Sequence, residues 1–99
     1  MNLIESVTNR GFKVIEFIDR YDRRCNIQKS SLGTEDAIWF GIEAAEPKIL
    51  ASKVMKGGTG WVDYLIHEDV VITTRMHLTV NQVRALLPIL QKFVDTGKL

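Results

Sequence analysis

The feature that most constrains this chain is a C-terminal segment, Thr79 to Thr96, with the pattern of an amphipathic helix. Thr79 and Gln82 have the T-x-x-Q spacing of a capping box, in which each side chain binds the backbone N–H of the other residue. Apolar residues then recur at three- and four-residue spacing, which places them on one side of a helix. They form the helix stripe: Val83, Leu86, Leu87, Leu90, Phe93 and Val94. We expect this stripe to face the core of the protein.

Two further residues bear on this helix. Gly97 stands where a left-handed C-cap is expected, because glycine adopts positive φ without steric cost. Pro88 cannot donate a backbone hydrogen bond to the carbonyl of Arg84, so we expect a bend there, at a cost of about 3 kcal/mol.

The first half of the chain has the patterns of short β-strands separated by turns. Phe12–Ile18 is dense in Phe, Val and Ile and predicts a central strand. Cys25–Lys29 predicts the returning strand, with Arg20–Arg24 as a polar hairpin loop between the two. After a cluster of turn-forming residues at Ser30–Asp36, Ala37–Ile42 predicts a third strand.

The second half is less regular. Lys48–Met55 is readable as a short strand or as a helical turn, and Lys56–Gly60 predicts a flexible loop. Trp61–Ile66 is apolar again, and Val70–Leu78 alternates apolar and polar residues as a half-buried strand does. The whole pattern predicts a small α+β protein: one domain, residues 1–99, with an antiparallel sheet of four to five strands packed by the C-terminal helix.

Composition limits the classes of protein to consider. A chain of 99 residues has room for one hydrophobic core, and its net charge of +1 gives no long-range attraction to nucleic acid or to an anionic membrane. Its apolar runs are far shorter than the roughly 20 residues that cross a bilayer, and no signal peptide is recognisable. One cysteine, Cys25, excludes an internal disulfide. We expect a cytoplasmic protein in a reducing compartment.

Charge is unevenly distributed along the sequence. Residues 10–29 contain six basic and three acidic side chains, whereas residues 30–46 contain four acidic and no basic ones. The predicted hairpin combines arginines with an aromatic ring, a mixture that binds phosphates and stacks on bases. Its residues are Arg20, Tyr21, Arg23 and Arg24. Asp19 and Asp22 would partly neutralise them, so a self-paired, solvated loop is the simpler interpretation.

No set of residues predicts catalysis. Three residues are of types that bind metal ions or act as nucleophiles: Cys25, His67 and His77. Their spacing does not support a site, because the histidines are ten residues apart and no C-x-x-C pair accompanies them. We therefore expect no catalytic residues, no metal site and no cofactor. The chain is predicted not to be an enzyme.

Aromatic residues give the best indication of an interface. Trp39 and Phe40 are adjacent in a predicted strand and so point to opposite faces, which means that at least one needs cover from elsewhere. Trp61 and Tyr64 flank the flexible loop and are either core residues or anchors for a protein partner. Exposed sheet edges offer a second route, to a partner or to a second copy of the chain in a homodimer.

Several segments resemble a family of small proteins encoded by bacteriophages and prophages. The resemblance covers about half of the chain, in Ser30–Ile42, Thr73–Thr79, Gln82-Val83, Ala85–Pro88 and Gln91. It brings no catalytic residue. It implies an accessory protein of a mobile element, made in a bacterial cytoplasm, and many such proteins act by stoichiometric binding, anti-CRISPR and other anti-defence inhibitors among them.

The sequence hypothesis is therefore a non-enzymatic binding protein that blocks or modulates a bacterial protein, for example a component of a defence complex such as CRISPR-Cas. The alternative is a small nucleic-acid-binding regulator that uses the hairpin Arg20–Arg24.

Overall fold

The computed structural model describes residues 2–31 and 33–99 of the chain. Leu32, which belongs to the predicted turn after the second strand, lies outside the described residues. The chain divides into two compact units, residues 1–43 with 75–99, and residues 44–74. The prediction of an α+β fold is confirmed, while the assignment of one domain to residues 1–99 stays a prediction.

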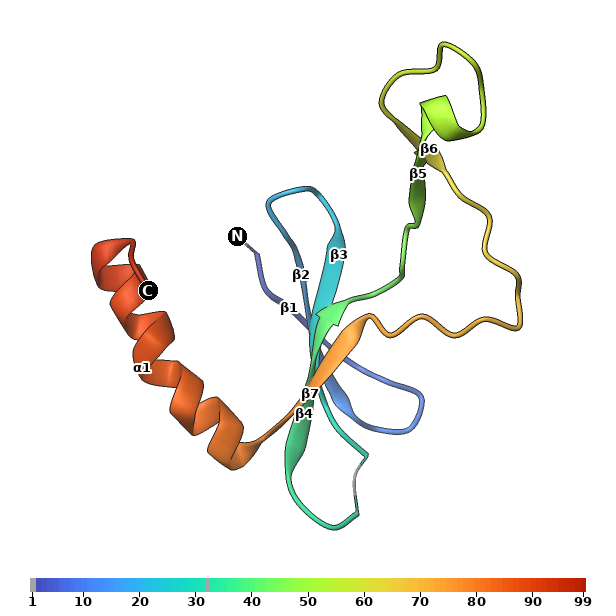
Figure 1. Ribbon diagram of the computed structural model, residues 1–99. Coiled ribbons are helices and arrows are strands. Elements are labelled where there is room, and N and C mark those ends of the chain that lie inside the picture. The colour runs from blue at the N-terminus through green and yellow to red at the C-terminus, as the bar shows by residue number, and fades with distance from the viewer. Residues whose placement is uncertain (1, 32) are drawn as a thin grey trace. The chain divides into compact units, whose positions relative to one another are not determined.

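The first unit contains a five-stranded antiparallel sheet in the order β1-β2-β3-β4-β7 (Figure 1). Its strands are β1 Ile4–Val7, β2 Lys13–Ile18, β3 Arg24–Lys29, β4 Ala37–Ile42 and β7 Arg75–Thr79. The three strands predicted in the first half of the chain are confirmed, and β2 has a neighbour on each side, as expected of a central strand. The sequence prediction missed β1.

The tight turn between β1 and β2 explains how so short an edge strand is held. The hydroxyl of Thr8 accepts a hydrogen bond from the backbone N–H of Phe12 at 3.0 Å, and the backbone N–H of Thr8 donates to the carbonyl of Phe12 at 2.8 Å. Gly11 has a φ of 84°, which a residue with a Cβ rarely adopts. The turn chemistry, rather than strong strand propensity, positions Ile4–Val7 beside β2.

The register divides the sheet into two chemically different faces, because residues paired across an antiparallel sheet lie on the same face. The polar face is defined by Glu16, Asn26, Gln28, Trp39, Arg75 and His77. The apolar face is defined by Ile15, Phe17, Ile27, Ile38, Phe40, Ile42, Met76 and Leu78. Trp39 and Phe40 thus lie on opposite faces, as predicted.

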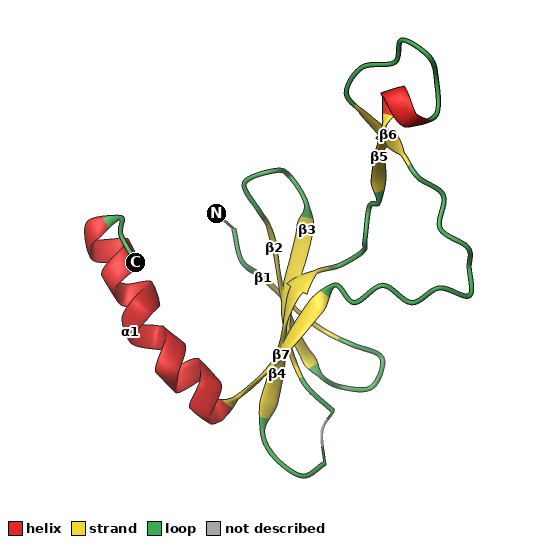
Figure 2. Cartoon of the chain, viewed as in Figure 1, coloured by secondary structure: helices red, strands yellow, loops and turns green. Residues whose placement is uncertain are grey.

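The C-terminal helix α1 runs from Val80 to Thr96 (Figure 2). Thr79 is its N-cap, and both hydrogen bonds of the capping box with Gln82 are present, at 2.9 and 3.2 Å. Gly97 ends the helix with a φ of 73° and donates its backbone N–H to the carbonyl of Phe93. The helix continues through Pro88. Both predicted caps are confirmed.

The expectation that the helix stripe faces the core is wrong for this structure. Among the described residues, none of α1 is buried; Val83 is half-buried, while the exposed fractions of Leu87, Leu90 and Val94 are 58%, 55% and 77%. The stripe is real, but periodicity cannot show what covers it. The placement depends on the junction at Thr79, which is both the last residue of β7 and the N-cap, so no loop separates strand from helix.

The second unit is a small hairpin of β5, Lys48–Leu50, and β6, Trp61–Asp63, with a 3-10 turn η1 at Ala51–Lys53. The segment Lys48–Met55 is therefore both a strand and a helical turn, the two alternatives left open by its sequence. Lys48 pairs with Asp63 across the hairpin, and this hydrogen bond lowers the pKa of the Asp63 carboxyl. The strand predicted over Val70–Leu78 is wrong before Arg75, because residues 70–74 form no ladder.

Candidate functional site

The predicted basic hairpin is built around the carboxylate of Asp19. Its Oδ1 accepts backbone hydrogen bonds from Tyr21 and Arg23, both at 2.9 Å, and Asp22 takes the left-handed φ of 61° that closes the turn. Tyr21 is 83% exposed. Asp19 is therefore committed to the backbone of the turn, and the expected pairing of Asp19 and Asp22 with the arginine side chains stays a prediction.

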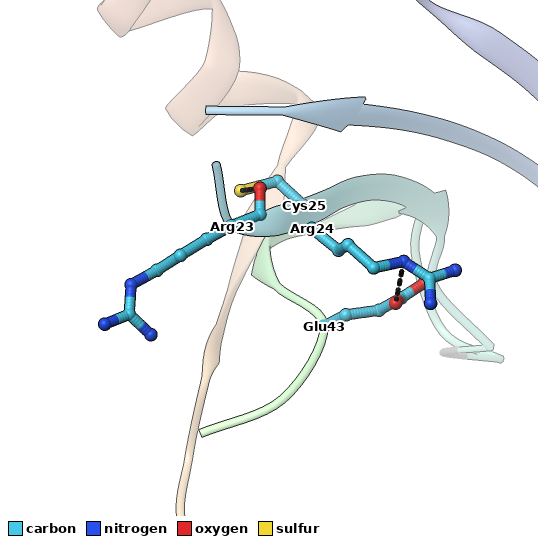
Figure 3. A network of polar contacts seen from close by, with 4 residues as sticks. All are labelled: Arg23, Arg24, Cys25 and Glu43. Carbon is cyan, nitrogen blue, oxygen red and sulfur yellow. Dashed lines mark hydrogen bonds and ion pairs between the residues drawn. The ribbon is translucent and has the colours of Figure 1, made fainter. Parts of the chain in front are cut away.

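The two adjacent arginines of this hairpin do not converge. Figure 3 shows Arg23 and Arg24 pointing in opposite directions, as neighbouring residues of a strand do. The Nε of Arg24 lies 3.1 Å from Oε2 of Glu43, so its charge is partly neutralised within the unit. The thiol of Cys25 donates a weak hydrogen bond to the carbonyl of Arg23, at 3.6 Å. The arrangement does not make a single phosphate-binding surface.

Cys25 is buried, on the same side of the sheet as the apolar face. Desolvation by burial and then the negative charge of Asp19 raise the pKa of its thiol, which disfavours the thiolate needed for nucleophilic attack. The structure thus places the cysteine in an environment that suppresses its reactivity.

The two histidines have other surroundings. His67 accepts the backbone N–H of Asp69 on Nδ1 at 3.1 Å, and the ring of His77 lies 5.4 Å from that of Trp39. Within residues 2–31 and 33–99, no cluster of three or more metal-ligating side chains is found.

Trp39 lies in a polar cluster that the sequence did not reveal. The guanidinium of Arg75 lies 5.0 Å from the centre of its ring, within cation–π distance, and the rings of His77 and Trp39 form a T-shaped pair. Asn26, 3% exposed, lies one residue pair further along the same face. Asn26 Oδ1, Trp39 Nε1 and Arg75 Nε have no hydrogen-bond partner among the described residues. Only the register of β3, β4 and β7 brings these residues together.

The opposite, apolar face is open. Seven of its eight defining residues are half-buried and Met76 is 54% exposed, whereas a face covered by a second layer would be largely buried. Phe17 and Phe40 are in contact here, with ring centres 6.2 Å apart. Beside this face and the first two turns of α1 is a groove of about 360 Å³ that includes Ile38, Leu78, Val83 and Leu87 in its lining.

The second unit exposes the aromatic residues that its sequence singled out. Trp61 is 66% and Tyr64 50% exposed, so the interpretation of both as core residues does not fit this unit. Trp61 pairs with Leu50 across the hairpin, and the backbone N–H of Tyr64 donates to the carbonyl of Pro47 at 3.0 Å. The segment after Tyr64 is also apolar, with Leu65 and Val71 almost fully exposed.

These surfaces belong to a small α+β protein whose apolar groups are largely uncovered. Comparison with protein-family models, with curated proteins and with solved structures finds no match. Among the described residues, no helix has the length and apolar character needed to cross a membrane.

Proposed function

We propose that this chain is a non-enzymatic binding protein that acts by stoichiometric contact with a bacterial protein. The observation that carries the proposal is the balance of apolar groups between interior and surface. Among the described residues, the buried apolar side chains are Val14, Cys25, Ala37 and Ala51, all small or medium in size. Large apolar and aromatic side chains are exposed on both units, and exposed apolar patches of this kind are typical of interaction sites.

The second unit supplies the surface best suited to a foreign protein. Trp61 and Tyr64 are rigid, amphipathic side chains of the type that dominates binding hot spots, and they stand on a hairpin pinned by Lys48 and Asp63. A partner that covers these two rings would remove apolar surface from water with little loss of backbone entropy in the hairpin.

The resemblance to phage and prophage proteins extends the proposal to the partner's identity. On that basis the chain is an accessory protein of a mobile element, and its target is a component of a bacterial defence system such as CRISPR-Cas. Occlusion of a functional surface on the target is the mechanism, because occlusion requires affinity and no chemistry from the inhibitor.

Affinity capture of the tagged full-length chain from a bacterial lysate tests this proposal. We expect one host protein in stoichiometric amount, lost when Trp61 and Tyr64 are both replaced by alanine. The matched control replaces Lys53 and Lys56, which are exposed in the same unit, and should retain the partner. Absence of any stoichiometric host protein, together with unchanged phage plating on a host with active CRISPR-Cas, would overturn the proposal.

Nucleic-acid binding through Arg20–Arg24 is the alternative, and the geometry supports it less. Arg23 and Arg24 diverge, Arg24 is paired with Glu43, and the net charge is only +1. A titration with DNA and RNA at low and moderate salt separates the two proposals, because phosphate binding weakens steeply as salt rises. Salt-sensitive binding abolished by charge reversal at Arg23 and Arg24 would favour the alternative.

A further inference from the structure

The chain carries two apolar surfaces that meet at the groove lined by Ile38, Leu78, Val83 and Leu87 and are otherwise largely uncovered. One is the apolar face of the five-stranded sheet, and the other is the helix stripe of α1. In proteins most of the stability of a helix comes from packing of its apolar side, so the stripe needs a covering surface. The apolar face needs one for the same reason, since a single sheet buries its face only against a second layer.

We propose that the protein is a homodimer in which α1 of each copy packs its stripe on the apolar face of the other copy. Two copies that exchange helices in this way satisfy all four surfaces at once. The exchange is reciprocal, so the assembly closes around a two-fold axis and does not continue into a filament. The homodimer goes beyond the proposed function, because it concerns how two copies of the chain assemble and does not depend on which host protein the chain binds.

The charges around the apolar face agree with an apolar occupant. Lys13 and Lys29 stand at one end of this face, and each already has a partner in its own copy. The Nζ of Lys13 lies 3.2 Å from Oε1 of Glu5, and the Nζ of Lys29 lies 2.6 Å from Oδ1 of Asp36. Both lysines are therefore already paired, and an uncharged helix side can cover the apolar face without breaking either ion pair.

The dimensions also fit. The groove beside Ile38, Leu78, Val83 and Leu87 measures about 360 Å³. An apolar cavity of roughly 150 Å³ already holds a benzene-sized group, so this groove has room for side chains of an incoming helix. The apolar face and the stripe together supply a substantial part of the roughly 20–30 residues per partner found in stable interfaces. Polar neighbours such as Gln91 and Lys92 would form the rim.

The direct junction between β7 and α1 favours exchange over folding back. Thr79 has extended backbone dihedrals, φ −77° and ψ 168°, and Val80 is already helical. With no loop residue between strand and helix, the chain has no flexible linker to turn α1 over its own sheet. Short connections of this kind are known to promote exchange of elements between copies.

Cross-linking in a mixed population tests the exchange. Phe93 is replaced by a photo-reactive benzoyl-phenylalanine, and unlabelled and heavy-isotope-labelled full-length chains are unfolded together, refolded and irradiated. We expect cross-linked peptides that join residue 93 of one isotope to β2, β3 or β4 of the other. Cross-links to the sheet only within one isotope would show that α1 folds back on its own copy, and no cross-link to the sheet would show a different occupant; either result would overturn the proposal.

A pair of helix variants provides the second measurement. Leu90→Glu places a charge on the stripe, whereas Gln91→Glu places the same charge one residue away on the polar side. We expect Leu90→Glu to weaken dimerisation at least tenfold and Gln91→Glu to leave it nearly unchanged. Equal effects of the two variants would contradict the assignment of the stripe to the interface. This test is independent of the proposed function, because it does not require a host protein.

Discussion

Thr79 controls the junction between sheet and helix with one side chain. Its hydroxyl accepts the backbone N–H of Gln82 at 3.2 Å, and its own backbone N–H donates to Oε1 of Gln82 at 2.9 Å. Asp19 has a comparable role in the turn before β3, where one carboxylate oxygen binds two backbone N–H groups. Single polar side chains thus fix where α1 and β3 begin.

Replacing Thr79 by alanine should remove the cap and destabilise the protein by about 1 kcal/mol, because the N–H of Gln82 loses its acceptor. Thr79→Ser keeps the hydroxyl and should stay close to the wild type. Denaturant unfolding at one fixed protein concentration measures both. A wild-type stability for Thr79→Ala would show that the capping box contributes nothing.

Cys25 gives a pH-dependent prediction. Burial raises the pKa of its thiol, so the folded chain keeps this proton to a higher pH than the unfolded chain does. The resulting stabilisation is complete below the unfolded pKa of about 8.5 and is lost as the pH rises towards the folded pKa. We therefore compare the free energy of unfolding of the wild type with that of Cys25→Ala. The difference in favour of the wild type should become smaller between about pH 7 and pH 10. A difference that stays constant over this range would contradict the shift.

The elements differ in how far local sequence determines them. Strands β2, β3 and β4 and both ends of α1 follow from strand propensity, alternation and capping residues. Strand β1 could not be predicted, because its pairing depends on the turn at Thr8–Phe12. The alternation at residues 70–74 was misleading, since a strand also needs a neighbour to pair with. In the same way, the cluster of Trp39, Arg75 and His77 depends on the pairing of β4 with β7, which local sequence does not encode.

In the second unit, Gly58 lies against η1, and the loop around it is tied by backbone hydrogen bonds. A Cβ at Gly58 would lie 2.8 Å from the carbonyl oxygen of Ala51, closer than atoms tolerate, and Ala51 is buried. Gly58→Ala should therefore destabilise this unit by roughly 1–3 kcal/mol, as overpacking commonly does.

Amide hydrogen exchange of Ala51, whose N–H donates to the carbonyl of Gly60 at 2.9 Å, reports on Gly58→Ala. Faster exchange is expected in the variant. Thr59→Ala, at the exposed neighbouring position, is the control and should leave the exchange rate unchanged. Wild-type protection in Gly58→Ala would show that the loop relaxes at no cost.

In the whole molecule, the apolar sheet face and the helix stripe need cover, which the proposed dimer supplies. The stripe of α1 is readable from sequence, but its position is not, because a periodic pattern shows that a helix has an apolar side without showing what faces it. The proposed dimer uses residues of the first unit, α1 and the apolar face, whereas Trp61 and Tyr64 belong to the second unit. The two proposals therefore concern different residues.

Sedimentation equilibrium of the untagged chain tests whether the protein is a dimer. The mass of one chain is 11.3 kDa, and we expect twice this mass at micromolar concentration, with Leu90→Glu shifted towards the single-chain mass. A folded wild-type chain that sediments as a monomer throughout the accessible concentration range would contradict the account, because its apolar sheet face and helix stripe would then be stable without a second copy.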